Sequence, residues 1–79
     1  MEEEMMEFAK NLKMLENIAK PWMSKEAISR YGNLKVAHPD KAVKAISFIA
    51  QAVRLGKIKE TVTDEQFKGL LMEINNGAL

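Results

Sequence analysis

Few residues of this chain could support catalysis. His38 is the single histidine and there is no cysteine, so a Cys–His pair and a metal site built from several histidines are excluded. A Ser–His–Asp set would have to join His38 to Ser24, Ser29 or Ser47. His38 instead precedes Pro39 at an expected helix boundary, where we expect it to serve the helix cap. No glycine-rich phosphate motif is present. We therefore predict no enzyme, no metal and no cofactor.

Basic side chains carry the other chemistry that the sequence offers. Residues 25–59 contain eight bases and two acids, net +6, whereas residues 1–24 have net charge −2 and residues 60–79 have −3. A basic segment between acidic ones favours a polyanion-binding surface, although a solvated surface of mixed charge explains the same composition. On duplex DNA these side chains would neutralise phosphates without reading sequence. The candidates are Lys25, Arg30, Lys35, Lys41, Lys44, Arg54, Lys57 and Lys59.

The basic segment must be positioned by a helix over residues 39–55, which Pro39 begins and Gly56 ends. Its polar arc comprises Asp40, Lys41, Lys44, Ser47, Gln51 and Arg54. Most of the remaining circumference is apolar, so this helix should be central. Phe48 and Leu55 break the pattern, because they lie seven residues apart inside or beside the polar arc. Either the N-terminal helix covers them, or they form an exposed contact site for another protein.

An N-terminal helix is expected over residues 2–20, ended by Pro21. Its apolar stripe, at alternating steps of four and three, comprises Met1, Met5, Phe8, Leu12, Leu15, Ala19 and Trp22. We expect this stripe to dock on the rest of the chain. Pairing with a second copy, or binding a partner protein through Phe8 and Leu12, are the alternatives.

Two further helices follow from local signals. Ser24 can cap a helix over residues 24–36. Thr63 and Gln66 form a capping box for a helix over residues 63–75, after an unpaired connector whose Ile58 and Val62 tuck into the core. The predicted fold is all-α, a compact three-helix bundle core (23–79) with an additional N-terminal helix (1–22) that could move independently.

The location of the protein is suggested by what the sequence lacks. No apolar run approaches the roughly 18 residues that a membrane span needs. The acidic start MEEE also differs from the basic start of a secretory signal. We expect a cytoplasmic monomer that does not bind membranes.

Three segments, in order, resemble the programmed cell death 5 family. They are MSKEAISRYGNLKVAHPD at residues 23–40, IAQAVRLGKI at 49–58 and IKETVTDEQFKGLL at 58–71. The resemblance implies a compact helical core with a mobile N-terminal helix. It also implies double-stranded DNA binding, as in archaeal members, or protein partners such as a chaperonin and a histone acetyltransferase, as in eukaryotic members.

Several departures from the family pattern bear on function. The family commonly continues into a basic tail, but residues 75–79 carry no charged side chain, and the N-terminal helix is acidic where the family's is mixed or Arg-rich. Ile28 also replaces an arginine. We therefore expect a weak, sequence-nonspecific binder of double-stranded DNA. The alternative is a protein-interaction adaptor that uses the N-terminal helix and the apolar patch around Phe48 and Leu55.

Overall fold

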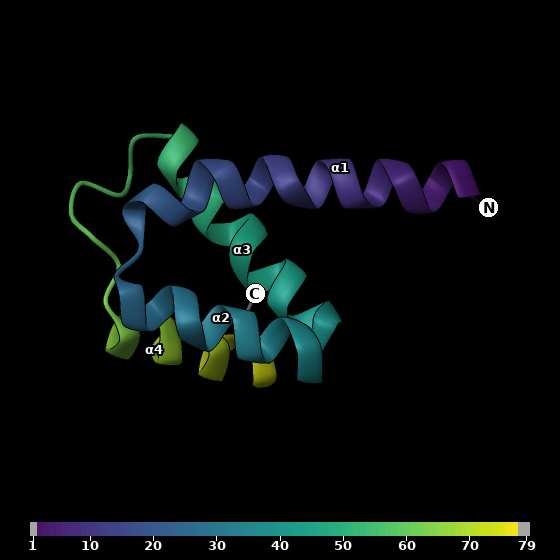
Figure 1. Cartoon of the computed structure of the whole chain (residues 1–79). Coiled ribbons are helices and arrows are strands. Elements are labelled where there is room, and N and C mark those ends of the chain that lie inside the picture. Colours follow the sequence, from purple (N-terminus) through teal and green to yellow (C-terminus); the bar gives the residue numbers. More distant parts are fainter. Residues whose placement is uncertain (1, 78–79) are drawn as a thin grey trace.

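The chain folds into four α-helices and one short 3-10 turn, with no strand between residues 2 and 77 (Figure 1). The computed structural model describes the backbone of residues 2–77 and the side chains of residues 10–77. The elements are α1 (Glu2–Ala19), η1 (Lys20–Trp22), α2 (Lys25–Ala37), α3 (Pro39–Arg54) and α4 (Asp64–Asn75). The all-α fold expected from the sequence is confirmed.

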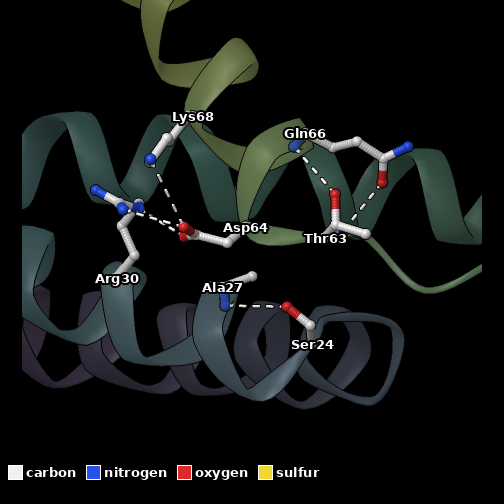
Figure 2. Close-up of polar contacts among 7 residues, drawn as sticks. All are labelled: Ser24, Ala27, Arg30, Thr63, Asp64, Gln66 and Lys68. Carbon is white, nitrogen blue, oxygen red and sulfur yellow. Dashed lines mark hydrogen bonds and ion pairs between the residues drawn. The ribbon is translucent and has the colours of Figure 1, made fainter.

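The helix ends follow the local signals of the sequence. Ser24 Oγ accepts a hydrogen bond from the N–H of Ala27 at 3.1 Å. At the start of α4, Thr63 Oγ1 accepts from the N–H of Gln66 at 3.2 Å, and the Thr63 N–H donates to Gln66 Oε1 at 3.0 Å (Figure 2). Gly56 follows α3 with a φ of 71°, the left-handed conformation in which glycine ends helices. The predicted caps are therefore confirmed at these positions.

His38 joins α2 to α3 through its backbone. Its N–H donates to the Leu34 carbonyl at 2.6 Å, and its carbonyl accepts from the N–H of Ala42 at 3.1 Å. The imidazole makes no capping hydrogen bond. Histidine lacks the short oxygen-bearing side chain that best reaches the first free amides of a helix. The expectation that His38 serves the cap is thus right for its backbone and wrong for its ring.

Helix α3 is central, because it contacts each of the three other α-helices. Five of its side chains are buried, namely Ala42, Ala45, Ile46, Ile49 and Ala50. Around them lie the buried side chains of Ala19, Met23, Ala27, Tyr31 and Phe67. Full burial of a large apolar side chain such as Ile46 or Phe67 stabilises the fold by roughly 1.5–3 kcal/mol.

Helix α1 docks on α3 through its C-terminal half, and its N-terminal end extends beyond the other helices (Figure 1). Ala19 is fully buried, and Leu12 and Leu15 pack against the core. These contacts confirm intramolecular docking for that part of the stripe, whereas Trp22 is 37% exposed. Met1 and the side chains of Met5 and Phe8 lie outside the described residues. The division of the chain at residue 22 stays a prediction.

The connector between α3 and α4 is held by backbone pairing, which the sequence analysis did not expect. Val62 donates its N–H to the Trp22 carbonyl at 2.7 Å, and its carbonyl accepts from the N–H of Ser24 at 2.9 Å. Ile58 and Val62 pack against the core, as predicted. Between residues 2 and 77, every helix is too short or too polar to cross a bilayer.

Candidate nucleic-acid interface

The outer arc of α3 is open to solvent. Lys44 and Arg54 are exposed, and Lys41 is half-buried. On the same arc Phe48 is 46% exposed and Leu55 is 62% exposed. Of the two alternatives for this apolar pair, cover by α1 is therefore wrong, and an exposed position is what the structure shows.

Beside this arc, the connector contributes two exposed lysines. Lys57 and Lys59 line an open groove of about 460 Å³ between α3, the connector and α4. We call it the Phe48 groove, and its lining is formed chiefly by Phe48, Lys57, Ile58, Lys59, Val62 and Leu70. The sequence analysis had singled out Phe48 as an off-pattern residue, but it did not predict the groove. Val62 and Leu70 are far from Phe48 in sequence and reach it only through the fold.

On α2, Arg30 is held by an acid of α4. Its Nε and Nη2 donate to the two carboxylate oxygens of Asp64 at 2.5 and 3.0 Å, and Lys68 Nζ lies 4.0 Å from the same carboxylate (Figure 2). The hydrogen bonds from Arg30 hold the pKa of Asp64 below its usual value. This bidentate pair links α2 to α4 and gives Arg30 a structural partner.

Lys35 is likewise engaged, at the buried acid of α1. Glu16 is only 6% exposed, and it accepts hydrogen bonds from Tyr31 Oη at 2.6 Å and Lys35 Nζ at 2.9 Å. Burial raises the pKa of Glu16, but the two hydrogen bonds together with the charges of Lys20 and Lys35 outweigh it, so the net shift is downward. Burial, followed by the hydrogen bond to Glu16, raises the pKa of Tyr31. Glu16, Tyr31 and Lys35 thus form a hydrogen-bonded group that links α1 to α2, and we call it the latch.

The eight candidate bases thus fall into two groups. Lys25 and Arg30 border a hollow between α2 and α4 that also contains Glu26 and Asp64, so its charges balance. Lys35 is paired with Glu16. The other five form what we call the α3–connector surface, comprising Lys41, Lys44, Arg54, Lys57 and Lys59. Among residues 10–77, no acid lies within ion-pair distance of these five.

Within the part of the chain that the structure describes, no three His, Cys, Asp or Glu side chains gather to hold a metal ion. The fold and the site together define a small all-helical protein that presents an exposed cationic surface.

Comparison with known proteins identifies the family to which this all-helical chain belongs. The chain belongs to the family described as "Double-stranded DNA-binding domain", whose sequence model matches residues 1–78, and this confirms the resemblance to the programmed cell death 5 family. A DNA-binding protein of Methanococcus maripaludis is 40% identical over 52 residues, which cover 66% of this chain and 44% of that relative. The match therefore spans less than half of the relative's length. No solved structure matches the chain.

Proposed function

We propose that the chain binds double-stranded DNA weakly and without sequence preference, through phosphate contacts from the α3–connector surface. The observation that carries the proposal is the set of five bases on one helix arc and its following connector, with no acid partner among residues 10–77. Bases that form no ion pair within this range are available for phosphate neutralisation. The family description and the named relative support DNA as the polyanion.

The composition of the exposed arc supports nonspecific binding. Base-edge readout uses side chains such as Arg, Asn and Gln on a helix that enters the major groove. On α3 the centre of the arc holds Phe48, and Gln51 is the only side-chain amide. Contacts to phosphates would then dominate, with a dissociation constant on the order of 10⁻⁴ to 10⁻⁶ M at physiological salt.

The three bases of α2 take a lesser part in this proposal. Arg30 and Lys35 would have to share their donors between a phosphate and Asp64 or Glu16. Lys25 is exposed beside Glu26. We therefore expect Lys25, Arg30 and Lys35 to add long-range attraction rather than the main contacts.

An amide-shift titration with a short blunt duplex at low and moderate salt tests the proposed surface. The largest shifts should fall on α3 and the connector and shrink at the higher salt concentration. Charge reversal of Lys44 and Arg54 to Glu should weaken binding on the order of tenfold. The matched control reverses two exposed bases of α1, Lys10 and Lys13, and should lose less affinity. Equal losses in the two variants would count against the α3–connector surface.

A second candidate function is a protein-interaction adaptor, favoured by the exposure of Phe48 and Leu55. Deletion of residues 1–20 would be an unclean test, because it removes Glu16 and Ala19 from the core. Substitution of Phe48 and Leu55 by Ala leaves the core intact. An adaptor would lose its protein partner in this variant while keeping the salt-dependent DNA affinity.

We further propose that the protein acts as a cytoplasmic monomer. Sedimentation equilibrium would test the oligomeric state.

A further inference from the structure

We propose that the Phe48 groove binds one unpaired nucleobase of DNA, so that the protein prefers a duplex with a bulged or frayed base to a fully paired one. This inference rests on the proposed function, and it adds a ligand site to it. The groove lies beside the five bases of the α3–connector surface, two of which, Lys57 and Lys59, line it.

The aromatic ring is the first reason. Tyr31 and Phe67 are buried in the core, at 1% and 0% exposure, whereas Phe48 is 46% exposed on the groove wall. Ile58 and Leu70 continue the apolar lining beside it. A nucleobase has the flat π-face that stacks on such a ring, and this interaction tolerates any base.

The size and polar groups of the groove are the second reason. Its volume of about 460 Å³ is within the range of small-ligand sites, which is roughly 300–1,000 Å³. Gln66 lines it too, with its Oε1 already bonded to the Thr63 N–H at 3.0 Å. The Gln66 amide nitrogen makes no hydrogen bond within residues 10–77, so it can donate to an acceptor on a base edge.

Charge complementarity supports a nucleotide as the occupant. Lys57 and Lys59 outnumber the one acid of the lining, Glu60, and can neutralise the phosphates on either side of a bound nucleotide. A base inside a duplex cannot reach the groove without leaving its stack, and an unpaired base leaves most easily. An acidic peptide with an apolar side chain would bind the same lysines, but its binding would not require an aromatic ring at position 48.

The test compares two labelled duplexes of one sequence by fluorescence anisotropy, one blunt and one with a single bulged base. The wild type should bind the bulged duplex about tenfold more tightly. Phe48→Ala and Phe48→Leu should lose this preference and keep the blunt-duplex affinity within about twofold, whereas Phe48→Tyr should keep both. Circular dichroism melts of the three variants establish that each is folded. An unchanged preference in folded Phe48→Ala overturns the inference.

Direct stacking is read from a tryptophan introduced by Phe48→Trp in a Trp22→Phe background. The bulged duplex should quench its fluorescence at a much lower concentration than the blunt duplex does. Equal affinity of the wild type for the two duplexes, or quenching by an acidic peptide and not by the bulged duplex, overturns the nucleobase site while DNA binding stands. Absence of binding to either duplex at low salt would instead overturn the proposed function.

Discussion

At the scale of single residues, Glu16 is the buried charged side chain that joins α1 to α2. It is nearly inaccessible to water, and its two partners, Tyr31 and Lys35, are one turn apart on α2. A buried carboxylate is tolerated only when donors replace the water that it loses. The latch therefore links α1 to α2, in addition to the packing of α1 on α3.

Tyr31→Phe removes one donor of this latch and leaves its carboxylate buried. We expect the free energy of unfolding to fall by about 1.5–3 kcal/mol, the range for hydrogen bonds to charged groups. Urea unfolding followed by circular dichroism measures the change. Val36→Ala, at a side chain that is 86% exposed, is the matched control and should change stability by less than about 0.5 kcal/mol. Equal effects of the two substitutions would contradict the latch.

The same carboxylate predicts a pH dependence. The pKa of Glu16 is lowered in the folded chain from an ordinary value of 4.5, so the unfolded chain takes up the proton first as the pH falls. Its contribution to stability is then fully present above about pH 4.5 and is lost as the pH falls through the lower folded pKa. Melting temperatures between pH 7 and pH 3 should fall less steeply for Glu16→Gln than for the wild type. Parallel curves would show that Glu16 does not contribute this dependence.

These polar pairs were beyond sequence analysis for a physical reason. Glu16 is 15 residues from Tyr31, and Arg30 is 34 residues from Asp64. No periodic pattern marks an acid that faces a base on another helix. The sequence analysis accordingly assigned Arg30 and Lys35 to DNA, whereas the fold gives each of these bases an acid partner.

At the scale of helices, the ends were predictable because they depend on neighbours in sequence. Ser24, Gly56 and the Thr63–Gln66 pair each act within a few residues, and each behaves as predicted. What local signals could not show is the pairing of Val62 with Trp22 and Ser24, which joins distant segments. Val62 also lines the groove beside Phe48, together with residues distant in sequence, and so the groove was missed too.

Substitution of glycine by alanine should have opposite effects on stability at two positions of the chain. Gly56 ends α3 at a φ of 71°, so Gly56→Ala should lower the free energy of unfolding by about 1–2 kcal/mol. Gly69 lies inside α4, and a Cβ there meets nothing within 4 Å, so Gly69→Ala should raise stability by about 0.5–1 kcal/mol. Thermal and urea unfolding of both variants checks the pair. Effects of the same sign would show that backbone conformation does not control these positions.

At the scale of the whole molecule, the two faces of α3 have different roles, one in the core and one at the surface. Its inner face supplies Ala45, Ile46 and Ile49 to the core, while its outer arc carries Lys44 and Arg54 beside Phe48. The net charge of the chain is only +1, so attraction to a polyanion must come from this uneven distribution.

The salt dependence of duplex binding tests the central claim most directly. Phosphate contacts release counterions, so the logarithm of the association constant should fall linearly with the logarithm of salt concentration, with a slope near −0.9 for each neutralised phosphate. Conversion of Lys44 and Arg54 to Gln should make the slope less negative by about one to two, and duplexes of unrelated sequence should give the same slope. Affinity that does not change between low and moderate salt would contradict DNA binding through the α3–connector surface.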